Sequence, residues 1–203
     1  MVAIIDYGAG NLMSVKKALD FIGAESEITM DKAKIKSASH IILPGVGSFG
    51  DAMKSMEERG LVETVKSAAL SGKPFLGICL GLQLLFGSSD ESDGVEGLNL
   101  LNGKVSSIPK NVGLKVPHMG WNSVSVQQNG GIFKDIPDES YFYFVHSYYL
   151  NGADEADVAG TTEYGVNIQC AVQRGNLCAT QFHPEKSGEI GLKLLENFLA
   201  LEG

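Results

Sequence analysis

The chain has 203 residues, of which 44% are hydrophobic and 20% charged, and its formal net charge is -8. These values are typical of a globular domain with a substantial core, so we expect one domain over residues 1–203. The negative charge, without a basic cluster, argues against nucleic acid or an anionic membrane as a partner. The chain starts with a strand-like segment rather than a signal peptide, and no apolar run reaches the length of about 18 residues that a membrane span needs. We therefore expect a cytoplasmic protein.

Three cysteines, an odd number at spacings that match no zinc site, indicate free thiols in a reducing compartment. Cys170 and Cys178 lie in segments of alternating polarity and are interpreted as small apolar core residues. Cys79 differs, because it directly follows an apolar strand-like run. We expect neither a metal ion nor a cofactor.

The first half of the chain alternates predicted strands and helices. Short apolar runs at 2–6, 40–47 and 75–79 are predicted as buried strands that end in turns. Helices are predicted between and after them at 11–22, where Asn11 is a candidate N-cap, at 48–71 with a break near Gly60, and at 80–86. Strands that alternate with helices in this way predict a parallel sheet.

The second half contains mainly strand-like runs. They lie at 122–127, 141–150, 157–162, 169–174 and 177–182, and a last helix is predicted after Ser187. We interpret these runs as antiparallel additions to the sheet. The expected fold class is therefore α/β, with a mostly parallel central sheet extended by antiparallel strands in the second half.

The segment Gly77-Ile78-Cys79-Leu80-Gly81 lies at a predicted strand-to-helix junction. A nucleophile on such a sharp turn projects above the sheet edge, and small neighbours let the backbone turn tightly. The N-terminus of the following helix favours the thiolate, and the backbone N–H of Leu80 would point toward an oxyanion formed beside the sulfur. A buried cysteine between packing glycines is an equally common reading of this pattern alone.

A nucleophilic cysteine needs a base, and the chain offers four histidines: His40, His118, His146 and His183. His40 is interpreted as a surface residue before a strand, and His118 lies in the loop-like stretch PHMGWN. His146 follows an aromatic run, where packing or substrate contact would explain it. His183 ends a strand-like run, and Glu185 follows two residues later, placed to orient the imidazole. Together with the sharp turn at Cys79, a nucleophile elbow, this pair predicts a cysteine–histidine–glutamate triad.

FLGICLGLQLLF and QFHPEKS together resemble the catalytic signature of class I glutamine amidotransferases. The resemblance implies a flavodoxin-like, three-layer fold in which Cys79 is the nucleophile, His183 the general base and acid, and Glu185 its orienting partner. It also implies glutamine contacts from Gln83, Glu91, His146, Ser147 and Tyr148. Gly87 stands where relatives are expected to have an acidic residue, a departure that affects the loop 88–94 and leaves the triad untouched.

The turn Pro44-Gly45-Val46-Gly47 follows a predicted parallel strand, at the end where ligand sites of open α/β sheets gather. An N–H group of Val46 or Gly47 is a candidate to complete the oxyanion hole with Leu80. The alternative is an ordinary glycine-rich turn.

Three further segments, IIDYGAGNLMSVKKAL, LPGVGSFGDAM and PHMGWNSV, resemble the glutaminase subunits of imidazole glycerol phosphate synthases. The resemblance implies hydrolysis of glutamine to glutamate and ammonia through a cysteine thioester. The ammonia would supply a (β/α)₈-barrel cyclase partner, in a heterodimer, that makes imidazole glycerol phosphate and AICAR in histidine biosynthesis. The family's partner-facing surface implies interface roles for Asn11, Met119, Trp121, Asn122 and Tyr143.

Alternatives to this function remain. One is a stand-alone cysteine hydrolase of peptides or small esters, because a nucleophile elbow serves many substrates. Another is a paralogous glutaminase that feeds a different synthase, for example in cell-surface sugar amidination. DYGAGN argues against a glutaminase of anthranilate or pyridoxal phosphate synthesis, and the filled triad positions argue against a catalytically silent subunit.

Overall fold

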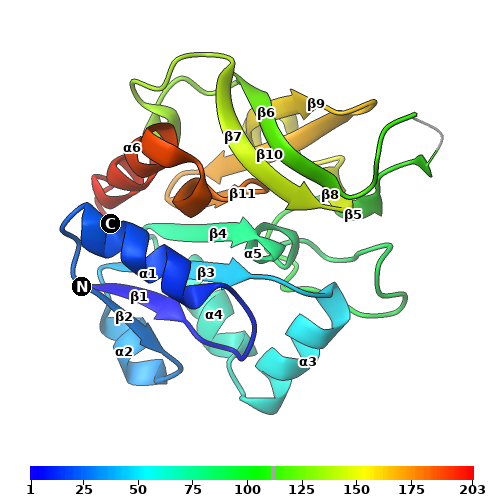
Figure 1. Cartoon of the computed structure of the whole chain (residues 1–203). Helices are drawn as coiled ribbons and strands as arrows, with labels where there is room; N and C mark the ends of the chain where they lie inside the picture. The colour runs from blue at the N-terminus through cyan, green and yellow to red at the C-terminus, as the bar shows by residue number, and fades with distance from the viewer. Residues whose placement is uncertain (111–112) are drawn as a thin grey trace.

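The computed structural model describes residues 1–110 and 113–203. Within this part of the chain, the central sheet has nine strands in the order β2-β1-β3-β4-β11-β10-β9-β6-β7 (Figure 1). One half of the sheet is parallel and consists of β2 (Ser26–Thr29), β1 (Val2–Ile5), β3 (His40–Gly45), β4 (Phe75–Cys79) and β11 (Leu177–Thr180). The strand β11 is the final strand along the sequence, but in the sheet it lies in the middle, between β4 and β10.

The other half of the sheet is antiparallel. It consists of β10 (Asn167–Arg174), β9 (Val158–Glu163), β6 (His118–Val126) and β7 (Ser140–His146). A separate two-stranded antiparallel sheet pairs β5 (Lys104–Ser107) with β8 (Tyr148–Asn151). The expected mixture of a parallel sheet with antiparallel additions is confirmed.

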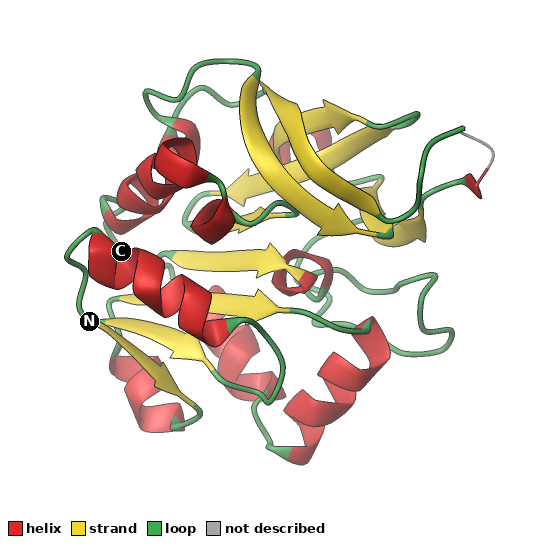
Figure 2. Cartoon of the chain, in the orientation of Figure 1, coloured by secondary structure: helices red, strands yellow, loops and turns green. Residues whose placement is uncertain are grey.

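Helices cover both faces of the parallel half, which gives three layers (Figures 1 and 2). On one face lie α1 (Leu12–Phe21) and α6 (Gly188–Leu199), and on the other α2 (Lys32–Ser37), α3 (Phe49–Glu58) and α4 (Val62–Ala69). Successive strand residues alternate between the two cores: Val2 and Ile4 pack with the first pair of helices, and Ala3 and Ile5 with the other three. Burial on both faces explains why these strands are continuously apolar.

Several local predictions differ from the structure. Asn11 precedes α1, but its side chain makes no capping hydrogen bond. The helix predicted at 80–86 is shorter, because α5 covers only Leu80–Gln83. The run 141–150 is two strands in two different sheets, with Ser147 between them. PHMGWN was wrongly interpreted as a loop: it enters β6 at His118, whose side chain is buried by pairing with β7.

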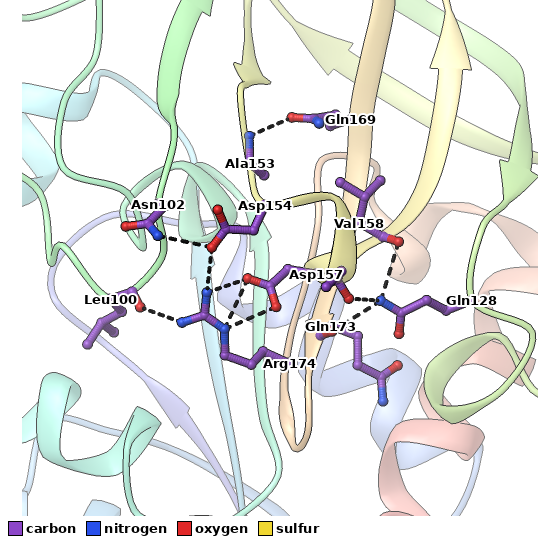
Figure 3. A network of polar contacts seen from close by, with 11 residues as sticks. Leu100, Asn102, Gln128, Ala153, Asp154, Asp157, Val158, Gln169, Gln173 and Arg174 are labelled. Carbon is purple, nitrogen blue, oxygen red and sulfur yellow. Dashed lines mark hydrogen bonds and ion pairs between the residues drawn. The ribbon is translucent and has the colours of Figure 1, made fainter.

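Figure 3 shows a polar network around Arg174. It lies at the opposite end of the sheet from Cys79. Arg174, at the end of β10, donates hydrogen bonds to Asp154, Asp157 and the carbonyl of Leu100. Arg174 pairs with Leu177, which in turn pairs with Phe75 at the start of β4. This network holds the antiparallel half of the sheet to the loop at Leu100. Among the helices of residues 1–110 and 113–203, none has the length and apolar character to cross a membrane.

Candidate active site

Cys79 is the last residue of β4, and α5 begins at the next residue. Its backbone has φ 56° and ψ -108°, a conformation that is strained for a residue with a side chain. The two flanking glycines permit this turn. A Cβ on Gly81 would overlap the carbonyl oxygen of Leu43, and one on Gly77 would lie 2.7 Å from the carbonyl oxygen of Gly81. The predicted elbow geometry is therefore present, and a buried cysteine in a relaxed strand is not.

His183 and Glu185 form a buried pair directly after β11. Glu185 lies in a short 3₁₀ helix, Pro184–Lys186, that begins after His183. The imidazole Nδ1 of His183 is 2.8 Å from Oε1 of Glu185, and the two side chains are 2% and 1% exposed. Nδ1 therefore carries the hydrogen that it donates to the carboxylate, which leaves Nε2 for the neighbouring thiol.

The charge state of His183 depends on Cys79 and Glu185. Burial alone would lower the pKa of His183, but its interactions with Cys79 and Glu185 outweigh burial and raise the pKa to about 9. Nε2 makes no hydrogen bond of conventional length with any described residue, so the nitrogen is free to exchange a proton with a reactant. Burial raises the pKa of Cys170 above the range of ordinary thiols, and that of Cys178 to about 12.

A buried glutamine pair lies next to Cys79. Gln181 Nε2 lies 3.7 Å from the sulfur of Cys79, and Gln181 Oε1 accepts a hydrogen bond of 3.1 Å from Gln83 Nε2. The same Gln83 nitrogen donates to the carbonyl of Tyr148 at 3.0 Å. Gln83 is thus held in a fixed orientation, and Gln181, two residues before His183, takes part in the site without having been predicted.

The predicted site residues gather around one cavity of about 360 Å³ above Cys79. Its lining includes the candidates for nucleophile, base, oxyanion hole and glutamine contact: Cys79, His183, Val46, Gly47, Leu80, Gln83, Glu91, His146, Ser147 and Tyr148. Pro117, Val145 and Lys186 complete the lining and were not predicted. Glu185 lies behind His183 and does not line this cavity, which suits an orienting role.

The acidic loop 88–94 packs against the start of α3. Glu91 Oε2 accepts a hydrogen bond of 2.7 Å from the backbone N–H of Phe49, and Ser92 Oγ accepts one of 2.9 Å from that of Gly50. These two bonds cap the helix that follows the turn Pro44–Gly47. Glu91 therefore lines the pocket and also anchors the segment that holds Val46 and Gly47.

Four of the five residues predicted for the partner interface lie on two faces of β6 and β7, whereas Asn11 directly precedes α1. Met119 is 65% exposed and Trp121 is 55% exposed on the outer face. Trp121 pairs across the sheet with Tyr143, with the ring centroids 6.1 Å apart. Asn122 is different, because it is half-buried on the opposite face and bonds to His118 and the carbonyl of Glu163.

Comparisons with known proteins are consistent with this geometry. The family Glutamine amidotransferase class-I matches residues 3–201. The imidazole glycerol phosphate synthase subunit HisH of Moorella thermoacetica is 53% identical over 197 residues, 97% of this chain and 93% of the relative. The HisH subunit of Methanothermobacter thermautotrophicus is 50% identical over 201 residues, 99% of this chain and 98% of the relative.

Solved structures share the fold at lower identity. A crystal structure of a glutamine amidotransferase superimposes with a TM-score of 0.77 at 20% identity and covers 99% of this chain and 98% of that one. The structure of PurLQS from Thermotoga maritima gives 0.76 at 23% identity, with 98% and 96% covered. The turn at Cys79 and the buried His183–Glu185 pair agree with matches to HisH subunits over almost the whole length of the chain. The chain therefore belongs to the class I glutamine amidotransferase family and, within it, to the HisH subunits of imidazole glycerol phosphate synthase.

Proposed function

We propose that this chain hydrolyses glutamine to glutamate and ammonia, and that it supplies the ammonia to a cyclase subunit with which it forms imidazole glycerol phosphate synthase in the cytoplasm. The observation that carries the proposal is the arrangement around Cys79. A thiol on a strained elbow shares one cavity with His183, and a buried Glu185 fixes the histidine tautomer. The extensive likeness to HisH subunits supports the choice of glutamine as substrate and of a cyclase as partner.

The first half of the reaction is acyl transfer to the enzyme. The Cys79 thiolate attacks the side-chain amide carbon of glutamine, a C–S bond forms, and the carbonyl oxygen becomes an oxyanion. Backbone N–H groups of Leu80 and of the turn at Val46 and Gly47 are our candidates to stabilise it. The His183 imidazolium donates its Nε2 proton to the leaving nitrogen, the C–N bond breaks, and ammonia departs.

The second half regenerates the enzyme. Neutral His183 takes a proton from water, and the resulting hydroxide attacks the thioester carbon. The C–S bond then breaks, which restores the Cys79 thiolate and the His183 imidazolium and releases glutamate. The Nδ1–H bond to Glu185 persists through both steps and stabilises the protonated ring. Water would protonate and dilute the ammonia, which is why we propose that it passes to a partner that consumes it.

The central test is the variant Cys79→Ala. We expect it to lose glutamine hydrolysis by at least about four orders of magnitude, since without the thiolate no thioester forms. Cys178→Ala is the matched control, because Cys178 is a buried core thiol away from the cavity, and it should keep full turnover. Release of ammonia from glutamine, compared with release of an alcohol from esters and of an amine from peptides, separates the two activities. Retained glutamine hydrolysis in Cys79→Ala would refute the proposal.

The paralogous alternative differs only in the acceptor of ammonia. Identity of 53% over nearly the whole length to a HisH subunit favours the histidine-pathway cyclase. Co-purification of the chain with its partner, followed by identification of that partner, distinguishes the two possibilities.

A further inference from the structure

Two buried histidines lie side by side behind the wall of the pocket. His118 on β6 pairs directly across the sheet with His146 on β7, and the side chains are 3% and 6% exposed. Nδ1 of His118 is 2.9 Å from Nε2 of His146. His146 lines the cavity, whereas His118 does not. The reaction described above uses neither ring, so this buried contact needs an explanation of its own.

The two rings belong to a chain of hydrogen bonds with a fixed group at each end. At the pocket end, Nδ1 of His146 is 2.9 Å from the carbonyl oxygen of Tyr148. At the other end, the Nδ2 amide of Asn122 is 3.3 Å from Nε2 of His118. The same amide donates to the carbonyl of Glu163 at 2.9 Å, and its Oδ1 accepts from the N–H of Ser123 at 2.9 Å.

These end groups determine where each proton sits. A carbonyl only accepts, so Nδ1 of His146 carries a hydrogen, and Nε2 of the neutral ring is an acceptor. Nδ1 of His118 must then be the donor to it. Nε2 of His118 is in turn an acceptor, and it receives the Asn122 amide, whose orientation is fixed independently by its two backbone contacts. Only the arrangement with both rings neutral and both protonated at Nδ1 satisfies every bond.

The surroundings of the pair favour these neutral rings. The ring of His118 is stacked between Tyr164 and Phe144, with centroid distances of 3.9 and 4.7 Å. Burial lowers the pKa of His118 to about 4. Burial, with the nearby charges of His118 and His183, lowers the pKa of His146 to about 3, against a smaller opposing effect of the Tyr148 carbonyl. Both rings therefore stay uncharged at neutral pH, and the positive charge beside the nucleophile is that of His183.

The series of hydrogen bonds through the two histidines ends at Tyr148, on the part of the cavity wall that we assign to glutamine binding. The carbonyl of Tyr148 accepts from His146 and also from Gln83, so it joins the histidine pair to the polar residues around Cys79. Ser147 and Tyr148 form the corner where the chain leaves β7 and enters β8 of the second sheet. The orientation of this corner depends on which nitrogen of His146 carries the proton, because the other tautomer cannot donate to the Tyr148 carbonyl.

We infer that His118 is a positioning residue for glutamine: it locks His146 in the neutral Nδ1-protonated tautomer and thereby holds the Ser147–Tyr148 wall of the pocket in its binding conformation. This inference rests on the proposed function, since it takes glutamine as the ligand of the cavity. His118 itself contacts no substrate. Its effect is therefore expected on glutamine affinity and KM, with little effect on kcat.

The tautomer is tested directly by the ¹⁵N shifts of the histidine side chains in the wild-type chain at neutral pH. We expect both His118 and His146 to show protonated Nδ1 and unprotonated Nε2. In His118→Phe, which keeps an aromatic ring for stacking, His146 should lose this single tautomer because its Nε2 has no donor. Protonated Nε2 on His146 in the wild-type chain would overturn the inference, whatever the catalytic activity of the protein.

The positioning effect is tested by calorimetric titration of glutamine into Cys79→Ala chains, in which no turnover occurs. We expect His118→Phe to weaken glutamine binding by about tenfold, the order of effect that an unsatisfied buried nitrogen produces. His118→Gln retains an amide donor and should restore most of the affinity. Asn197→Leu is the matched control: it removes the hydrogen bonds of 3.1 and 2.6 Å from the buried Asn197 amide to the carbonyls of Ile132 and Lys134, on α6 and away from the cavity.

Equal affinity of the His118→Phe and Asn197→Leu chains for glutamine would refute the positioning role. So would a loss in His118→Gln as large as that in His118→Phe, because the donor would then be irrelevant. Failure of glutamine to bind even the Cys79→Ala parent would instead contradict the proposed function, while the tautomer measurement still tests the histidine pair.

Discussion

Three buried histidines lie in the region of Cys79, our proposed nucleophile, and the neighbours of each ring determine its charge. His183 is next to a carboxylate and a thiol, and its pKa is raised to about 9. Burial lowers the pKa of His118 to about 4, and burial together with the charges of His118 and His183 lowers that of His146 to about 3. Since burial lowers the pKa of all three rings, the raised value of His183 comes from Glu185 and Cys79. At neutral pH the only imidazolium among these three rings is therefore that of His183, next to the sulfur of Cys79.

The raised pKa of His183 predicts the pH dependence of the enzyme. The imidazolium is present below about pH 9 and is lost as the pH rises through that value, so kcat/KM should fall above about pH 9. The contribution of protonated His183 to folding stability should also decrease as the pH rises. The folded-state pKa exceeds the ordinary value of 6.5, so this contribution is complete below 6.5 and is lost as the pH approaches 9.

Glu185→Gln tests the origin of this shift. Without the carboxylate, the pKa of His183 should fall, the alkaline limb of the kcat/KM profile should move to lower pH, and kcat at pH 7 should drop by about one to two orders of magnitude. The control is Glu189→Gln, which removes an exposed carboxylate from the first turn of α6. A pH profile of Glu185→Gln that matches the wild type would contradict the role of Glu185.

At the scale of whole elements, local sequence signals identified the strands and helices with strong internal patterns. The apolar runs of β1, β3 and β4 and the break at Gly60 between α3 and α4 were predicted correctly. β2 was missed because three of its four residues are only partly buried, and α2 because it is short and buries Ile35 alone. Elements that acquire their burial from distant partners leave little trace in a single sequence.

The site shows the same division. The turn around Cys79 and the segment His183-Pro184-Glu185 are each a short contiguous stretch of sequence. The chemistry of each could therefore be predicted without knowing that the two stretches lie close together. The contact between Gln181 and Cys79 and the pairing of His118 with His146 depend on neighbouring strands that come from remote segments. A buried polar residue just before His183 was the available sign for Gln181, but it does not specify a partner.

The start of α3 couples the acidic loop to the turn Pro44–Gly47. Glu91 and Ser92 both accept hydrogen bonds from the first N–H groups of this helix, and only Glu91 also lines the pocket. The two residues therefore separate the structural effect of the cap from an effect on glutamine. This arrangement also gives loop 88–94 a fixed position despite the departure from the family pattern at Gly87.

Glu91→Ala and Ser92→Ala should each lower the free energy of unfolding by about 1 kcal/mol, because each leaves a helix N–H without its acceptor. The KM for glutamine should rise by about tenfold in Glu91→Ala and much less in Ser92→Ala, since only Glu91 lines the pocket. Denaturant unfolding and steady-state kinetics on both variants give the comparison. An equal rise in KM for both would assign Glu91 to the helix cap alone.

For the whole molecule, the position of the exposed aromatic surface is informative. Met119 pairs with Val145, which lines the catalytic cavity, and Trp121 lies two residues further along the same face of β6. An exposed apolar surface therefore borders the pocket where we propose that ammonia is released. Exposed tryptophans that anchor an interface contribute a large share of its binding energy. A cyclase docked on Met119 and Trp121 would cover the pocket and shield the ammonia from solvent.

Trp121→Ala should weaken association with the cyclase subunit by at least about tenfold, because it removes a large apolar anchor from the proposed interface. The fold and the basal glutamine turnover of the isolated chain should not change, since Trp121 does not line the cavity. Leu70→Ala is the matched control: Leu70 is also exposed and apolar, at 69%, and it lies near Arg174 at the opposite end of the sheet. Sedimentation or calorimetric titration against the cyclase gives the dissociation constants. Equal affinity of the Trp121 and Leu70 variants for the cyclase would move the interface away from β6 and would leave the pocket without the cover that transfer of ammonia requires.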